Sequence, residues 1–128
     1  MLPARHRMRH SGDFARTIRS GSRAGGHHLV VHLLLADPER DVPTPAEPAR
    51  VGFVVSKAVG NAVRRNLVKR RLRAIVSDRL GELPDGALAV VRALPASAGA
   101  SHAELLTAVD RSIDVAIQRQ RSPRRVRA

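Results

Sequence analysis

The chain contains no cysteine, no tryptophan and no tyrosine, and only two phenylalanines among its 128 residues. Without cysteine it can form no disulfide bond, no thiolate metal site and no thiol nucleophile, and we expect a cytoplasmic location. With so few aromatic side chains, the protein is not expected to bind RNA by stacking many bases on an aromatic platform.

Long hydrophobic runs are also missing. The longest, LVVHLLLA, is far shorter than the roughly 20 apolar residues that a membrane-spanning helix needs. The N-terminal stretch MLPARHRMRH lacks the apolar segment of a signal peptide. Any membrane contact would be peripheral, and we expect no membrane partner.

Acidic residues are scarce. The chain has 11 of them against 23 lysines and arginines, which gives a formal net charge of +12 and an isoelectric point near 11.9. This excess is typical of proteins that bind a polyanion such as nucleic acid. The hydrophobic fraction of 43% is that of an ordinary globular protein, and the length fits one domain.

Hydrophobic periodicity and turn residues predict a single α+β domain with the element order αββαβα. The predicted helices and strands cover residues 11–20, 28–36, 51–56, 62–80, 86–94 and 101–118. The first two strands could pair as a hairpin across an acidic, proline-rich loop at residues 37–50. The domain, residues 11–118, is preceded by a basic N-terminal arm at residues 1–10 and followed by a basic, disordered tail at residues 119–128.

Helix ends carry recognisable signals. Ser11 is the expected N-cap of the first helix and Gly21 its end, while Gly81 is expected to close the helix at residues 62–80. Ser101 and Glu104 form the S-x-x-E pattern of a capping box.

The helix at residues 62–80 carries the most concentrated charge. At about 100° per residue, Val68, Leu72 and Ile75 share one face, which should pack on the sheet. Arg65 and Lys69, with other cations, lie on a neighbouring face, and no acid occurs between residues 49 and 77. Like charges four residues apart destabilise a helix unless an anion neutralises them, so this face predicts a nucleic-acid contact.

The turn before this helix and the remaining polar clusters indicate a function less specifically than the cationic helix does. Asn61 is a plausible N-cap that also leaves backbone amides free for a phosphate. The histidines near residue 30 lack the acids or cysteines that a metal site would add, so we expect no metal ligands there. No pattern of a nucleophile or of paired carboxylates indicates a catalytic site in this chain. Arg92, on the third strand, either contacts RNA or lies at a strand edge.

The stretch VGFVVSKAVGNAVRRNLVKRRLRAIV, residues 51–76, closely resembles the signature region of the bacterial ribonuclease P protein component. The family pattern V-G-x-x-V-S-K-K-x-G-x-A-V-x-R-N-R-x-K-R-x-x-R is matched at most of its defined positions. The resemblance extends upstream through RMRHSGDFARTIRSG and downstream through VVRALPA, and covers about 110 residues.

This resemblance implies a ribosomal protein S5 domain 2-like fold with a left-handed βαβ crossover. It implies two partners, the catalytic RNA of ribonuclease P and the 5′ leader of precursor tRNA, whose removal the RNA catalyses with Mg²⁺; the protein itself would bind no cofactor. It implies a leader cleft with Phe14, His32 and Lys57. The RNA-binding residues expected from the helix surface and the resemblance are Lys57, Asn61, Arg64, Arg65, Asn66, Lys69, Arg70, Arg71 and Arg73.

The chain departs from the family pattern at two positions of this region. Leu67 stands where the pattern has an arginine, and Ala58 where it has a second lysine. Arg64 or Arg71 could compensate for the arginine that is missing at position 67.

The main alternative is a ribosomal or other structural RNA-binding protein, which is also small and basic. A helix-turn-helix DNA-binding protein is disfavoured, because the segment before the basic helix is predicted as a strand, and we expect no DNA partner. A stand-alone nuclease is disfavoured because acidic metal ligands are missing.

Overall fold

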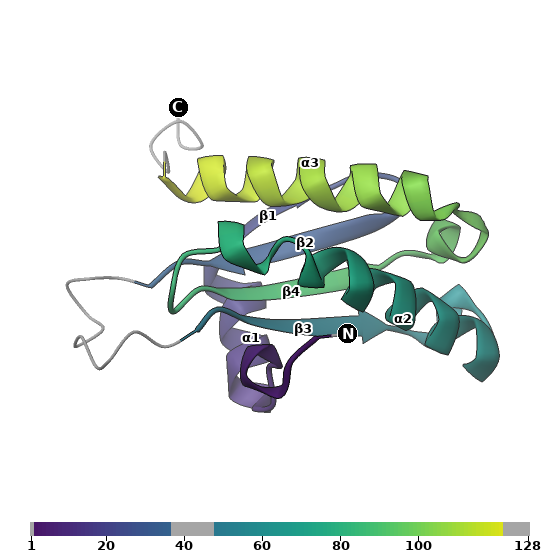
Figure 1. Ribbon diagram of the computed structural model, residues 1–128, viewed down its shortest axis with the longest axis horizontal. Coiled ribbons are helices and arrows are strands. Elements are labelled where there is room, and N and C mark those ends of the chain that lie inside the picture. Colours follow the sequence, from purple (N-terminus) through teal and green to yellow (C-terminus); the bar gives the residue numbers. More distant parts are fainter. Residues whose placement is uncertain (1, 37–47, 122–128) are drawn as a thin grey trace.

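A computed structural model describes residues 2–36 and 48–121. It contains one four-stranded sheet with helices on both faces, in agreement with the predicted α+β class. Helix α1 (Ser11–Ser20) lies behind the sheet in Figure 1, whereas α2 (Ala62–Ser77) and α3 (His102–Arg121) lie in front of it. The sheet is therefore the middle layer of three.

The strands are arranged in the order β1-β2-β4-β3. The short strand β1 (Ser22–Gly25) forms an antiparallel hairpin with β2 (Leu29–Leu34), and β2 is also antiparallel to β4 (Leu88–Ala93). Strand β3 (Arg50–Val55) is parallel to β4 and forms the other edge of the sheet. The predicted hairpin between the first two long strands is wrong, because β4 lies between β2 and β3.

The connection from β3 through α2 to β4 is the crossover that a parallel pair requires. In Figure 1, β3 and β4 both run from left to right, β4 lies above β3, and α2 passes in front of them. This path is left-handed, as the resemblance implied, whereas almost all such connections are right-handed.

Helix α2 is shorter than predicted. It ends at Ser77 with Asp78 as its C-cap, and not at residue 80 before Gly81. Asp78 N donates to Ile75 O and Arg79 N to Val76 O, so the chain tightens into i→i−3 bonds there. A separate 3₁₀ turn, η3 (Leu80–Glu82), follows.

The capping signals were correct for α3 and wrong for α1. Ser101 N donates to Glu104 Oε1 at 2.9 Å and Glu104 N donates to Ser101 Oγ at 3.1 Å, which confirms the capping box. The N-cap of α1 is His10, however, and Ser11 is already helical. Gly21 does follow α1, but with φ of −80° and not in a left-handed conformation.

The main core lies between the sheet and the two helices in front of it. Strand β4 contributes Ala89, Val91 and Ala93, while Leu105, Val109 and Ile113 line the buried face of α3 as the sequence predicted. Side chains at the intervening strand positions face α1, because successive residues of a strand point to opposite faces.

The N-terminal segment lies against the domain. Leu2 and Met8 are buried, the 3₁₀ turn η1 (Ala4–His6) lies between them, and Arg7 forms a parallel bridge with Val51 on the free edge of β3. The basic arm predicted at residues 1–10 thus has tertiary contacts. Most of the predicted acidic loop and of the basic tail lies outside the described residues, although the start of that tail, residues 119–121, belongs to α3.

Candidate nucleic-acid interface

The N-terminus of α2 is built by the turn before it. Asn61 Oδ1 accepts a hydrogen bond from Arg64 N at 3.0 Å, so the predicted N-cap is confirmed. Gly60 has φ of +153°, a conformation that side chains rarely adopt, and a Cβ there would lie 2.9 Å from Arg64 Cδ. The positive φ favours glycine at this position, whereas the long Arg64 side chain could move to relieve the contact.

Helix α2 has a buried apolar face and a more exposed cationic face, as the spacing of its residues predicted. Val68, Leu72 and Ile75 are buried against the core. Among the predicted RNA-binding residues of the helix, the exposed ones are Arg64, Asn66 and Arg70, and the half-buried ones are Arg65, Lys69, Arg71 and Arg73. Asn61 and Lys57, which precede the helix, are exposed, and Lys57 begins the 3₁₀ turn η2 (Lys57–Val59).

These cations have few partners within the chain. Arg71 Nη1 donates to Ala100 O at 3.2 Å, which ties that arginine to the 3₁₀ turn η4 (Pro95–Gly99) and its C-cap. The buried Nε of Arg65 has no acceptor. Within residues 2–36 and 48–121, no acidic side chain forms an ion pair with a cation of α2. Among the described residues, no carboxylate competes with an external anion for the positive charge of this surface.

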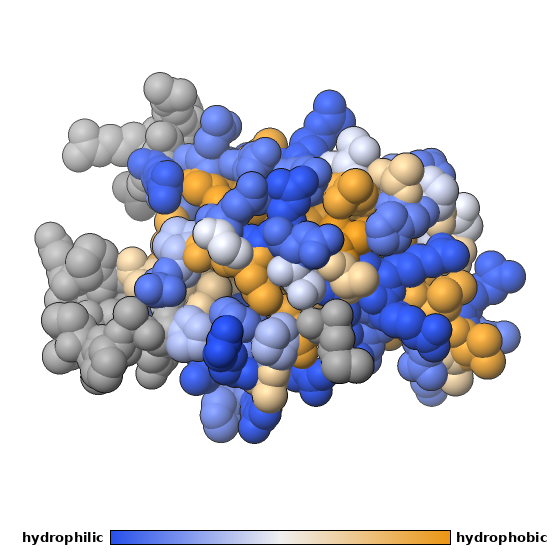
Figure 2. Space-filling view, viewed as in Figure 1, coloured by the Kyte–Doolittle hydropathy of each residue, from blue (hydrophilic) through white to orange (hydrophobic). Residues whose placement is uncertain are grey.

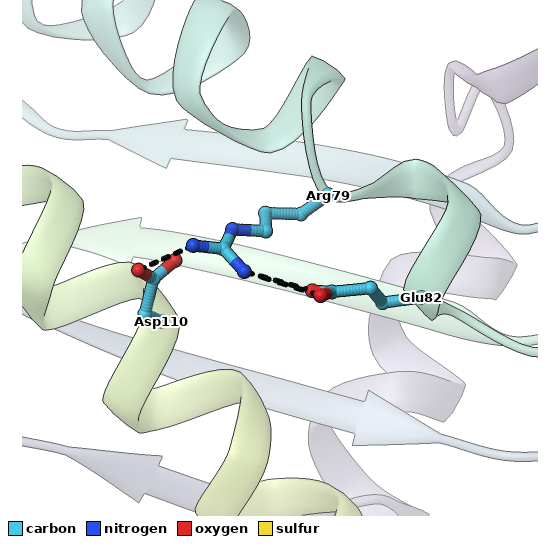
Figure 3. Close-up of polar contacts among 3 residues, drawn as sticks. All are labelled: Arg79, Glu82 and Asp110. Atoms are coloured by element: carbon cyan, nitrogen blue, oxygen red, sulfur yellow. Dashed lines mark hydrogen bonds and ion pairs between the residues drawn. The ribbon is translucent and has the colours of Figure 1, made fainter.

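Arg79, just beyond α2, differs from the cations of α2 because it forms ion pairs within the fold. Its guanidinium lies between Glu82, at 3.1 Å, and Asp110 of α3, at 2.5 Å (Figure 3). The hydrogen bond to Glu82, together with these negative charges, raises the pKa of Arg79 above its usual value. This arginine is neutralised within the fold and joins the end of α2 to α3, and so it does not belong to the free cationic surface.

Apolar side chains interrupt the cationic surface. Val63 is 79% exposed and Leu67 37% exposed, and the two lie one turn apart on α2. Figure 2 shows orange patches among the blue of the surface over this helix. The position where the family pattern has an arginine is thus an exposed leucine.

Phe14 and His32 lie on the face of the sheet that α1 covers. A Cβ on Gly52 would lie 2.3 Å from Phe14 Cζ, so the ring rests directly on the glycine backbone. His32 is paired across the sheet with Val90, and Val90 with Gly52. The two predicted cleft residues therefore lie over one row of the sheet.

His32 is only 4% exposed, and neither ring nitrogen has a hydrogen-bond partner. Burial, followed by the positive charges of Arg23 and Arg92, lowers the pKa of this histidine below its ordinary value, so the ring is held neutral. Arg92 itself is exposed and, by alternation along β4, shares the α1 face. Lys57 lies just past the end of β3, away from this row.

His27 and His28 lie in the turn between β1 and β2. His27 and His28 stack edge to face at 5.1 Å, and His28 Nε2 lies 3.8 Å from Glu104 Oε2. In the part of the chain that the structure describes, no three side chains of His, Asp or Glu gather to hold a metal ion. None of the described helices is long and apolar enough to cross a membrane.

The sequence did not single out the arginines of the N-terminal segment. Arg5, Arg7 and Arg9 line a cavity together with Arg50 at the start of β3. The only signal in the sequence was the basic composition of residues 1–10, which does not reveal that this segment lies beside residue 50.

A cationic helix without ion pairs among the described residues, carried on a small sheet, defines a basic α+β protein suited to binding RNA. Comparison with known proteins shows to which family of this class the chain belongs. The family model described as Ribonuclease P matches residues 2–117. The chain is 53% identical over 120 residues to the ribonuclease P protein component of Streptomyces bikiniensis, which covers 93% of this chain and 94% of that protein. The chain belongs to the bacterial ribonuclease P protein family.

Other relatives agree. The ribonuclease P protein component of Beutenbergia cavernae is 57% identical over 113 residues, 88% of this chain and 89% of its own length. A structure of the Staphylococcus aureus RNase P protein superposes with a TM-score of 0.71 at 23% identity, covering 87% of this chain and 94% of that one. The RNase P protein from Thermotoga maritima gives a TM-score of 0.66 at 22% identity, with 86% and 96% covered. At these identities the two structures support the fold alone.

Proposed function

We propose that this chain is the protein subunit of ribonuclease P and assists the RNA subunit in removing the 5′ leader of precursor tRNA. The observation that carries this proposal is the surface of α2, whose cations form no ion pair with an acid of residues 2–36 or 48–121 and whose helix is fixed by Val68, Leu72 and Ile75. Membership of the ribonuclease P protein family supports RNA as the polyanion.

The catalytic RNA is the partner proposed for α2 and the turn before it. Arginine suits this task because its planar fork can donate two hydrogen bonds to one phosphate. The residues that would make these contacts are Lys57, Asn61, Arg64, Arg65, Asn66, Lys69, Arg70, Arg71 and Arg73. Arg71 would contribute least, since its guanidinium already donates to Ala100 O.

The α1 face of the sheet is proposed to hold the 5′ leader. Phe14 offers a half-buried ring there, Arg92 an exposed positive charge, and Lys57 a cation at the end of β3. His32 would act mainly by shaping this face, because the ring is buried in the free protein.

The chemistry belongs to the RNA in this proposal, with Mg²⁺ bound by RNA oxygens. The acidic side chains of the described residues do not gather into a metal site. The task of this chain is to bind and orient RNA, and we propose that it does so in the cytoplasm.

Reconstitution tests the proposal. The chain is mixed with its cognate ribonuclease P RNA, and cleavage of precursor tRNA is measured at Mg²⁺ concentrations too low for the RNA alone. We expect mature 5′ ends to appear at a strongly stimulated rate. Absence of stimulation, combined with co-sedimentation of the protein with ribosomes, would indicate the alternative of a ribosomal protein.

A further inference from the structure

A second cationic site lies at the opposite end of β3 from α2. Its cavity of about 290 Å³ is lined by Ala4, Arg5, Arg7, Arg9, His10 and Arg50. The N-terminal segment, the N-cap of α1 and the first residue of β3 contribute to it, so it is formed by parts of the chain some 40 residues apart.

The N-terminal segment is held firmly enough to form a site. Met8 N donates to Val51 O at 3.1 Å, and His6 Nδ1 lies 2.7 Å from Ala49 O. Leu2 is 1% exposed, and Arg7 Nε donates back to Leu2 O at 3.1 Å. These contacts fix the backbone on the edge of β3, so that the arginines converge instead of spreading into solvent.

The charge of this pocket is uncompensated within the described chain. Among residues 2–36 and 48–121, no carboxylate lines it and none forms an ion pair with its four arginines. Arg5 and Arg7 each donate one hydrogen bond, to His6 Nε2 and Leu2 O, and keep further donors for a ligand. Several guanidinium groups around one small cavity suit an anion with several acceptor oxygens, of which phosphate is the best match.

The position of the pocket indicates which phosphate it receives. Arg50 alternates with Gly52 along β3, so both lie on the α1 face, and Phe14 rests on Gly52. Lys57 lies beyond the other end of the strand, about 20–25 Å away at roughly 3.3 Å per residue. An RNA strand that leaves the α2 surface and passes over the α1 face therefore arrives at the arginines.

We propose that this pocket, which we call the arm pocket, binds backbone phosphates of the precursor-tRNA leader beyond the part held near Phe14. The inference rests on the proposed function and extends the leader site to the N-terminal segment. At about 3.4 Å per stacked nucleotide, the span along β3 corresponds to about six to seven nucleotides. A leader of about two nucleotides cannot reach the pocket, whereas one of about ten can.

The test uses reconstituted holoenzyme and the double variant Arg9→Ala/Arg50→Ala. Arg7 is left in place because it anchors the segment. The matched control is Arg111→Ala/Arg121→Ala, which removes the same charge from exposed positions on α3. We expect the arm-pocket variant to bind precursor tRNA with a ten-nucleotide leader about tenfold more weakly at low salt. Its affinity for a two-nucleotide leader should be that of wild type.

Salt dependence gives a second readout. Loss of two phosphate contacts on a single strand should lower the slope of log K against log salt by about 1.4. We expect this change for precursor tRNA with the ten-nucleotide leader and not for the two-nucleotide leader. The variant Arg50→Lys keeps the charge and should restore much of the affinity. Unfolding midpoints of all variants are measured, and a variant that does not fold is replaced by Arg5→Ala/Arg9→Ala, which leaves β3 unchanged.

Other outcomes overturn the inference. An equal loss of affinity for both leaders, with weaker binding to ribonuclease P RNA alone, assigns the pocket to that RNA. No loss for either leader means that the arginines bind no RNA phosphate. Both results are distinct from failure of the proposed function, in which wild-type protein itself would not stimulate cleavage.

Discussion

Removing two cations from α2 should weaken RNA binding without harming the fold. Arg65, Lys69 and Arg73 follow one another at intervals of four residues, and each is half-buried. Like charges at that spacing oppose helix formation by about 0.2–0.5 kcal/mol per pair. The variant Arg65→Ala/Lys69→Ala abolishes both repulsive pairs but loses some packing by the long side chains. We therefore expect a free energy of unfolding within about 1 kcal/mol of wild type.

RNA binding should respond very differently. If each side chain neutralises one phosphate, the slope of log K against log salt falls by about 1.4–1.8 in the double variant. Between about 50 and 200 mM salt, wild-type affinity for ribonuclease P RNA should then drop about tenfold more than the affinity of the variant. Filter binding or fluorescence titration at several salt concentrations measures both slopes, with Arg111→Ala/Arg121→Ala as the control. Weaker binding with an unchanged slope would refute the reasoning, because it would mean that the two side chains act through structure and not through charge.

Three further substitutions test single contacts. Asn61→Ala removes the N-cap of α2 and should lower the free energy of unfolding by about 1 kcal/mol in urea titrations; no loss would mean that water caps the helix equally well. Gly52→Ala forces Phe14 away from the sheet and should destabilise the protein by about 1–3 kcal/mol, and a stability equal to wild type would show that the ring moves freely. His32→Leu addresses pH. The pKa of His32 is lower in the folded protein than in the unfolded chain. Below about pH 6.5 the unfolded chain therefore binds a proton at this histidine while the folded protein does not. The free energy of unfolding of wild type falls as a result. The stability difference between variant and wild type should move in favour of the variant from pH 7 to 5, by at most about 1.4 kcal/mol per pH unit, and a difference that does not change with pH would contradict the buried, neutral ring.

Contacts within one or two helical turns were mostly predicted from the sequence, although the N-cap of α1 and the C-terminal end of α2 were wrong. The capping box of Ser101 and Glu104, the N-cap at Asn61 and the buried face of α2 all depend on residues within one or two turns of each other. Such contacts can be read from spacing alone. The unpaired charge of α2 belongs to the same class, because it follows from a run of cations without nearby acids.

Features that depend on distant residues were missed or wrong. Strand β1 was not predicted, because SRAG has only one buried side chain, Ala24, and pairs with β2 across a turn. The pairing of β2 and β3 was wrong because β4 fills the position between them, which no pattern in either strand reveals. The arm pocket was missed for the same reason, since Arg9 and Arg50 are neighbours only in the fold.

The central place of β4 in the sheet has a consequence for synthesis on the ribosome. Residues 88–93 hydrogen-bond to β2 on one side and to β3 on the other, yet they follow both strands in the chain. A nascent chain that has emerged only as far as α2 has the β1–β2 hairpin and β3 with no strand to join them. The helix with the cationic surface is thus complete before the sheet on which it packs. A long-range pairing of this kind forms slowly, so the ability to bind RNA in the correct geometry should arise late, when β4 is inserted.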